Sequence, residues 1–119
     1  MILPPDTESP RRARRFVRDA LLDDQVDTTL DVVTLLVSEV VTNAVLHARS
    51  DVTVRVRNDG RIVRVEVTDK SPAPPVQQYL SREATTGRGM VLVEALADAW
   101  GTNPGSDGKT VWFELDVAN

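Results

Sequence analysis

Two stretches of alternating residues, separated by a short turn, constrain the fold of this 119-residue chain more than any other feature. They read VTVRVRN (52–58) and RIVRVEVTD (61–69), and Asp59-Gly60 lies between them. Asp-Gly tolerates the positive φ angles of a tight turn, so the pattern predicts a β-hairpin. The alternation places valines on one face and mostly arginine and glutamate on the other. The predicted sheet therefore has one buried face and one solvent-exposed face.

Three other segments have the apolar spacing of α-helices. They cover residues 9–24, about 28–48, and 88–100. A final strand is predicted from about Lys109 to Val117, after a turn at Asp107-Gly108.

The order of these elements predicts the fold class. Strands joined by tight turns favour an antiparallel or mixed sheet, and the helices can then cover one face of it. We therefore predict an α+β fold, a two-layer α/β sandwich with a mixed, mostly antiparallel sheet and three helices on one face. The length suits one domain, which would span residues 1–119. Hydrophobic residues make up 41% of the chain and charged residues 27%, as is usual for a globular domain.

Charge and composition argue against several classes of site. The net charge of −4 disfavours a nucleic-acid-binding surface. The chain has no cysteine and one histidine, which excludes disulfides, thiolate metal sites and a metal site made of histidines alone. No apolar run is expected to reach the roughly 18 residues of a membrane span, and the N-terminus lacks the pattern of a signal peptide. The composition thus predicts a cytoplasmic domain without membrane contact.

Five arginines lie in the first predicted helix, around an apolar stripe that includes Phe16 and Val17. They are Arg11, Arg12, Arg14, Arg15 and Arg18. A run of like charges on a helix is more often a solvated face than a partner surface, so we favour the solvated face.

Three polar residues, Glu39, Asn43 and His47, recur at intervals of four in the second predicted helix. The rest of this helix is apolar nearly all round, which is typical of a buried helix. A buried carboxylate is unfavourable unless it is paired or faces a polar cavity, so the polar line is expected to border a cleft. The alternative is that Glu39 and Asn43 bridge neighbouring backbone or are exposed. The helical spacing alone does not separate these interpretations.

Two further motifs are also ambiguous when taken alone. Gly87-Arg88-Gly89 directly precedes a helix, where glycines and free amides can approach a phosphate. It lacks the third glycine of the dinucleotide-binding fingerprint and the Lys-Ser/Thr ending of a Walker A loop, so by itself it indicates only a turn into a helix. Asp69 ends a strand and would enter the same cavity from the sheet, although aspartates at strand ends are commonly turn formers.

Taken together and in this order, the motifs resemble the N, G1 and G2 boxes of the GHKL ATPase superfamily. They are Glu39-x-x-x-Asn43, the Asp69 strand end and Gly87-x-Gly89. The resemblance extends from about Pro10 to Leu115 and is strongest to the anti-sigma-factor serine kinase group, especially the small actinobacterial ATP-binding regulators. The segments that carry it are RRARRFVRDAL, VSEVVTNAVLHA, VTDKSPAPP, TGRGMVLVEALADAWG and GKTVWFEL.

The resemblance implies ATP and Mg²⁺ as cofactors, and a role for each matching residue. Asn43 would ligate the Mg²⁺ that bridges the phosphates, Glu39 would be the general base, and Asp69 would accept a hydrogen bond from the adenine amino group. The remaining nucleotide contacts would come from Gly87, Arg88, Gly89, Met90 and Thr110, and the segment of about 70–86 would be the ATP lid. His47 would have a structural or partner-facing role.

The same resemblance implies a regulatory function. The expected activity is that of an anti-sigma factor serine/threonine protein kinase, which phosphorylates a STAS-type anti-sigma antagonist, sequesters a sigma factor and forms a homodimer. The alternative is an ATP-responsive protein-binding module with little catalysis. Glu39 and Asn43 favour the kinase. The superfamily's Asp-x-Gly-x-Gly box is replaced here by Asp69-Lys70-Ser71-Pro72-Ala73, which mildly favours the binding module.

Overall fold

A computed structural model of the chain describes residues 1–21, 27–71, 87–105 and 108–116. Only the backbone is described at 27–28 and 87–90. The elements, in chain order, are β1 (Ile2–Leu3), α1 (Ser9–Leu21), α2 (Asp27–Ala48), β2 (Val52–Asn58), β3 (Ile62–Asp69), α4 (Gly87–Leu96), β4 (Ala99–Gly105) and β5 (Gly108–Asp116).

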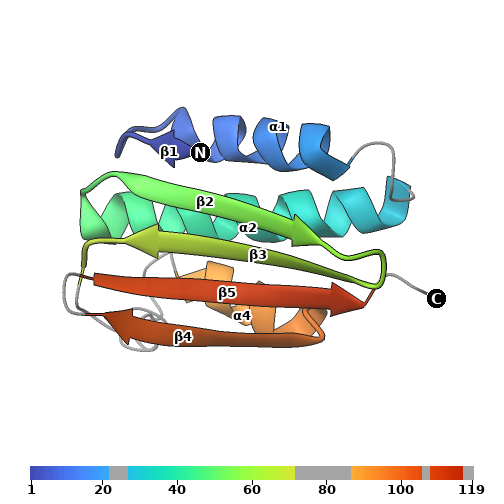
Figure 1. Cartoon of the computed structure of the whole chain (residues 1–119). Helices are drawn as coiled ribbons and strands as arrows, with labels where there is room; N and C mark the ends of the chain where they lie inside the picture. The colour runs from blue at the N-terminus through green and yellow to red at the C-terminus, as the bar shows by residue number, and fades with distance from the viewer. Residues whose placement is uncertain (22–26, 72–86, 106–107, 117–119) are drawn as a thin grey trace.

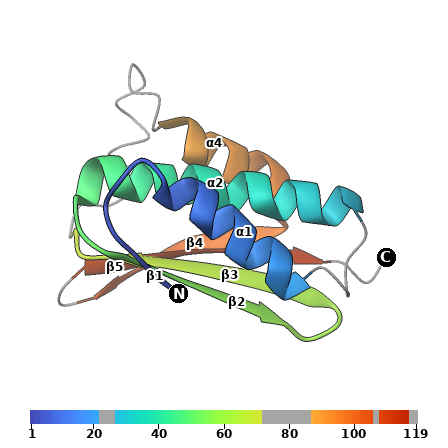
Figure 2. The same ribbon diagram turned by 90° about the horizontal axis from the view of Figure 1, so that it is seen from above.

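The strands form one five-stranded sheet in the order β1-β2-β3-β5-β4, and every neighbouring pair is antiparallel. The three helices in the described part of the chain lie on one face of this sheet, as Figures 1 and 2 show. The predicted α+β sandwich is therefore confirmed, with a fully antiparallel sheet where a mixed one was allowed. The opposite face of the sheet carries no helix of the described chain.

The central hairpin has the predicted register. Val54 lies opposite Val67 and Val56 opposite Val65, so the valines of both strands share the helix-covered face. At the turn, Gly60 has a φ of 91°, which an L side chain rarely adopts. The Asp59 carboxylate accepts hydrogen bonds from the backbone N–H groups of Ile62 and Arg61, at 2.8 and 3.0 Å. These two bonds, that from Ile62 first, lower the pKa of Asp59 because they stabilise its ionised form.

The C-terminal third of the chain differs from the prediction. The helix predicted over 88–100 ends at Leu96, and Ala99–Gly105 forms β4 instead. The backbone N–H of Asp98 donates to the carbonyl of Glu114, which starts the pairing of this segment with β5. β4 is an edge strand, and there Pro104 is tolerated although it lacks an N–H group. β1 was not predicted, and it pairs only two residues with β2.

The core lies between the sheet and α2, the central helix, which contacts α1, α4, β2 and β3. Leu30, Val33, Val37 and Val41 of α2 are buried against this core. By length and hydropathy alone, Thr29–Ala48 would qualify as a membrane span, with 20 residues and a mean hydropathy of 1.6. The expectation that no apolar run is long enough was therefore wrong. Half of that stretch is buried inside the fold, as expected for a core helix.

Candidate functional site

Polar side chains from three elements meet under α2 at one end of the sheet. They are Asn43 from α2, Asp69 at the end of β3, and Lys109 near the start of β5. Figure 1 shows why they meet: antiparallel pairing brings the end of β3 beside the start of β5, and α2 ends on the same side of the molecule. We call these three residues the buried polar cluster. Together with Val40, Ala44, Val67 and Val111 they line a cavity of only about 10 Å³.

Asp69 and Lys109 form a buried ion pair. They lie directly opposite each other in the β3–β5 ladder, and Lys109 Nζ is 3.1 Å from both Oδ1 and Oδ2 of Asp69. Their side chains are only 2% and 4% exposed. Asp69 Oδ1 also accepts the backbone N–H of Ser71 at 2.8 Å. A charge so deeply buried needs a partner of opposite charge, and Asp69 and Lys109 are each other's partner.

Among the residues that the structure describes, the side-chain oxygen of Asn43 has no hydrogen-bond donor. The residue is 4% exposed, and its Oδ1 atom has no hydrogen-bond partner within the described part of the chain. Most buried polar atoms in proteins are hydrogen-bonded, so an exception requires an explanation such as a bound ion or ligand. Glu39 lies one turn earlier on the same side of α2 and is half-buried. An amide oxygen is a suitable ligand for Mg²⁺, which prefers oxygen ligands. A half-buried carboxylate beside it can act as a proton acceptor.

The Gly87-x-Gly89 motif forms the first turn of α4. α4 packs against α2, and its N-terminus lies at the same end of the molecule as the C-terminal half of α2, as Figure 2 shows. The first N–H groups of a helix have no intrahelical acceptor, so this turn can bind an anion. The structure describes no side chain for Arg88 or Met90. Of the lid predicted over 70–86, only Lys70 and Ser71 fall within the described residues.

Thr110, expected to contact the nucleotide, does not lie in the buried polar cluster. Strand alternation places its side chain on the open face of the sheet, where its hydroxyl is 2.8 Å from that of Thr68. The neighbouring Lys109 faces Asp69 instead. A signal for Lys109 was present in the sequence, because it alternates in phase with Val111, Phe113 and Leu115, which are all buried. A lysine in phase with an apolar strand face indicates a buried charge with a partner.

His47 is exposed near the C-terminal end of α2 and does not line the cavity. The arginines of α1 are exposed as well.

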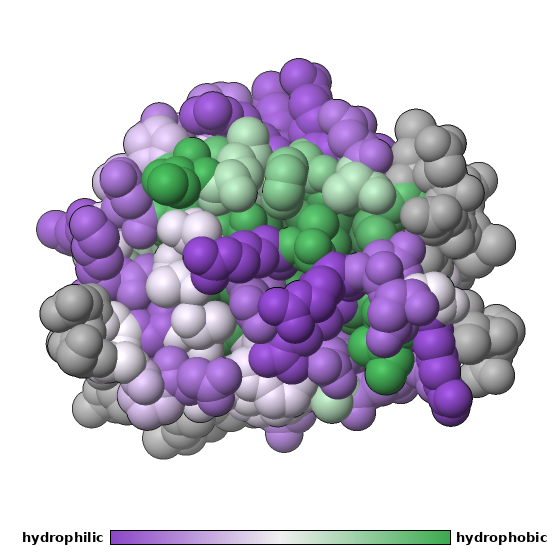
Figure 3. Space-filling view, viewed as in Figure 1, coloured by the Kyte–Doolittle hydropathy of each residue, from purple (hydrophilic) through white to green (hydrophobic). Residues whose placement is uncertain are grey.

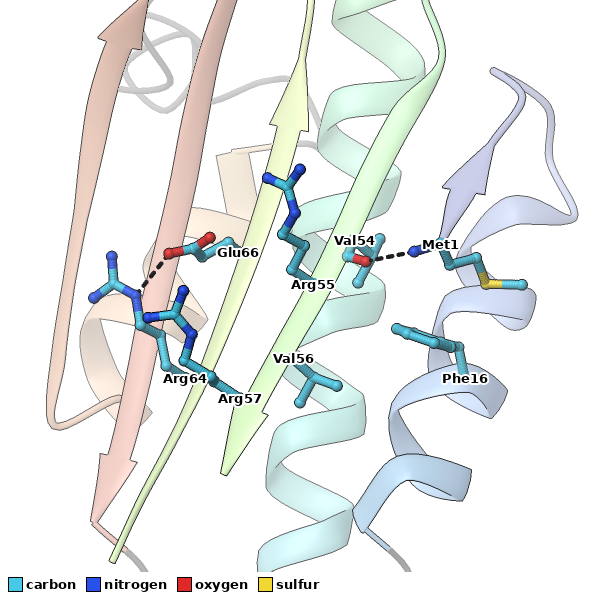
Figure 4. Close-up of a pocket in the computed structure, with 8 residues that line it drawn as sticks. All are labelled: Met1, Phe16, Val54, Arg55, Val56, Arg57, Arg64 and Glu66. Carbon is cyan, nitrogen blue, oxygen red and sulfur yellow. Dashed lines mark hydrogen bonds and ion pairs between the residues drawn. The ribbon is translucent and has the colours of Figure 1, made fainter. Parts of the chain in front are cut away.

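Larger hollows occur elsewhere, where α1 meets the edge of the sheet. One of about 270 Å³ is lined by Phe16, Val56 and the arginines of β2 and β3, and Figure 4 shows its lining residues. Another of about 530 Å³ lies along α1 and shares Met1 and Phe16 with the first. In Figure 3 apolar surface gathers in this region, between two hydrophilic margins. Neither hollow includes a residue of the buried polar cluster, so size alone does not identify the site.

The residues present fit a nucleotide unevenly. Asn43 and the first turn of α4 fit a metal ion and phosphate groups, because they provide an oxygen without a partner among the described residues and N–H groups that have no acceptor within the helix. The nucleotide base does not fit beside Asp69 in this arrangement. The Asp69 carboxylate is paired with Lys109, and the cavity of about 10 Å³ holds one water at most.

Comparisons with known proteins are consistent with this geometry. A family model described as a histidine kinase-like ATPase domain matches residues 3–115. The chain is similar to the histidine kinase domain of the blue-light activated histidine kinase from Erythrobacter litoralis EL346, with 28% identity and a TM-score of 0.55 over 76% of this chain and 45% of that one. A second structure of that kinase gives 29% identity and a TM-score of 0.57, over 80% and 32%. The chain thus spans less than half of either protein. A comparison with curated proteins found no match.

Proposed function

Because this chain belongs to the family of histidine kinase-like ATPase domains, which bind ATP, we propose that it is a Mg-ATP-dependent regulator with serine/threonine protein kinase activity. Its proposed substrate is a STAS-type antagonist of an anti-sigma factor, and the chain itself is proposed to hold the sigma factor and to form a homodimer. These partners are proposed from the sequence motifs alone. The chain matches only part of a histidine kinase.

One observation carries the proposal of ATP-dependent chemistry. The buried Oδ1 of Asn43 lacks a partner among the described residues, and a half-buried carboxylate, that of Glu39, lies one helical turn away. Bound Mg-ATP would supply the transferable phosphoryl group and the charge that stabilises it. Asn43 would hold the metal through its amide oxygen, and Glu39 would accept the proton of an incoming hydroxyl. The amides at the start of α4 would orient the phosphates.

The second candidate function is an ATP-responsive binding module with little catalysis. A specific observation favours it over an efficient kinase: Lys109 engages the carboxylate that would recognise the base. Weak nucleotide binding would then report ATP levels without supporting rapid turnover.

Substitutions in α2 test the assignment, because metal binding and proton transfer fail differently. Asn43→Ala should lower Mg-dependent ATP affinity and phosphoryl transfer together. Glu39→Gln keeps the size but removes the base, so it should leave ATP affinity nearly intact while slowing transfer by about 10²–10⁴-fold. Calorimetric titration with Mg-ATP measures binding, and γ-labelled ATP with candidate STAS proteins measures transfer.

Glu94→Gln provides the matched control, because it makes the same exchange at an exposed position of α4. It should change neither quantity. If Glu39→Gln weakens ATP binding as severely as Asn43→Ala, the two roles are assigned wrongly. Transfer that is absent from the unmodified chain, with ATP binding intact, would favour the binding module over the kinase.

A further inference from the structure

We propose that the Lys109 ammonium occupies the place of the ligand's amino group, and that a nucleotide base must displace it to reach Asp69. This inference rests on the proposed function, since it concerns the base end of the same site. The geometry of the pair supports it. Nζ lies 3.1 Å from both carboxylate oxygens, which is the position of an N–H donor that faces the carboxylate from the front. An amino group of a heterocyclic ring would need that same position.

The available space supports the same conclusion. The cavity that remains between Asn43, Asp69 and Lys109 measures about 10 Å³, far less than a purine ring requires. Its other walls are the apolar side chains of Val40, Ala44, Val67 and Val111. Two β-strands and the central helix hold these walls, whereas the lysine has a flexible stem with four methylene groups. The lysine side chain is therefore the part of the wall that can move most easily.

Lys109 can leave without unfolding of the strand. It is the second residue of β5, and its backbone stays paired with Asp69 whichever rotamer its side chain adopts. A lysine stem can lie along apolar surface while its ammonium reaches water, so an open state is physically accessible. In that state Asp69 keeps one donor, the N–H of Ser71, and offers its remaining lone pairs to a ligand.

This exchange would set both affinity and selectivity. A ring with an amino group next to the site can replace the ammonium as donor, whereas a ring with a carbonyl group there would direct an acceptor at a carboxylate. The apparent dissociation constant equals the intrinsic one divided by the fraction of molecules in the open state. If the pair is closed nine times in ten, removal of the lysine side chain should tighten binding by about tenfold.

The test is a series of substitutions at Lys109, with Mg-ATP and Mg-ITP as probes and calorimetric affinity as the readout. Lys109→Ala removes the competing donor and opens space, so it should bind ATP about tenfold more tightly than the unmodified chain. Lys109→Gln keeps a weaker, uncharged donor and should be intermediate. Lys109→Arg is the matched control, because it retains the charge and a buried donor, and should bind no more tightly than the unmodified chain. ITP carries a 6-oxo group and should gain nothing from Lys109→Ala.

The outcomes are distinguishable. If the unmodified chain binds ATP and Lys109→Ala binds it equally or more weakly, the lysine is not a competitor and the inference fails while the proposed function stands. ITP binding that equals ATP binding in the unmodified chain, and falls in Lys109→Ala, would show that the lysine contacts the base directly instead of being displaced, and would also overturn the inference. If neither the unmodified chain nor any variant binds ATP, the proposed function itself fails. Circular dichroism establishes folding, and Lys109→Gln tests the same order if Lys109→Ala does not fold.

Discussion

The two faces of the sheet carry ion pairs of the same kind in opposite surroundings. On the helix-covered face, Asp69 of β3 lies opposite Lys109 of β5, with both side chains almost fully buried. On the open face, Arg64 of β3 lies opposite Glu114 of β5, and its guanidinium donates to Glu114 at 2.8 Å and to Glu66 at 2.9 Å. Arg64 also lies 4.2 Å from the centre of the Trp112 ring. Its side chain remains 23% exposed.

The difference shows what burial does to a cross-strand pair. Water and salt screen the open-face pair, so its removal should lower the free energy of unfolding only slightly. The buried pair has lost its hydration, so each charge is stabilised mainly by the other, and removal of one leaves the other buried without compensation. Only at the buried pair does removal of one charge expose a binding position for another donor. The β3–β5 strand pair thus carries a partly solvent-exposed ion pair on one face and a candidate ligand site on the other.

The largest expected effect follows from separating the buried pair. Asp69→Ala leaves the Lys109 ammonium without its counter-charge and should lower the free energy of unfolding by about 3 kcal/mol, measured by urea denaturation. Combining it with Lys109→Ala should recover part of that loss, because no unpaired charge is then buried. If Asp69→Ala costs no more than Glu114→Ala, the contrast between the two faces does not hold.

Gly108 sharpens the comparison by testing how closely the two strands approach at the buried end. A Cβ atom there would overlap the carbonyl oxygen of Asp69, so Gly108→Ala must push β5 away from β3. We expect a loss of about 2 kcal/mol in the free energy of unfolding, measured by urea denaturation, and an altered affinity for Mg-ATP, measured by calorimetric titration.

Gly60→Ala is the control for Gly108→Ala. Nothing lies within 4 Å of a Cβ atom at Gly60, so only its positive φ should be felt, at about 1 kcal/mol. It should leave ligand affinity unchanged. Equal effects of the two substitutions on ligand affinity would contradict a special role for the close approach at Gly108.

The smallest effect is expected on the open face. Arg64→Ala removes two ion pairs and the contact with Trp112, yet it should cost only about 1 kcal/mol because the groups remain in contact with water. The loss should shrink as salt is raised from low concentration to about 1 M, whereas the loss for Asp69→Ala should change little. Urea denaturation at the two salt concentrations measures both. A salt-independent loss above that of Asp69→Ala would reverse the comparison.

Local patterns in the sequence predicted much of this architecture. The hairpin over 52–69 and the helix over about 28–48 were correct, because alternation and helical spacing extend over seven or more residues in each. β4 was missed for the opposite reason. Its segment, AWGTNPG, contains two glycines and a proline and has no clear alternation, and it is a strand because β5 is available to pair with it.

The candidate site shows the same division. Spacing alone brought Glu39 and Asn43 to one side of α2, since residues four apart on a helix are neighbours. The glycines of 87–89 were correctly placed at the start of a helix. Thr110 was assigned to the site although its strand phase directs it to the other face.

By itself, the sequence determined the central hairpin, the approximate positions of the helices, the covered face of the sheet and the family, since these follow from periodicity and from motifs within short segments. Only the tertiary structure decided which residue faces Asp69. Lys109 is separated from it by 40 residues, and the two meet because β3 and β5 pair in one particular register. The tertiary structure also decided that Asn43 Oδ1 is buried without a partner in the described chain. Neither fact is local, because each depends on which atoms the folded chain places around a side chain, and a segment read alone contains no such information.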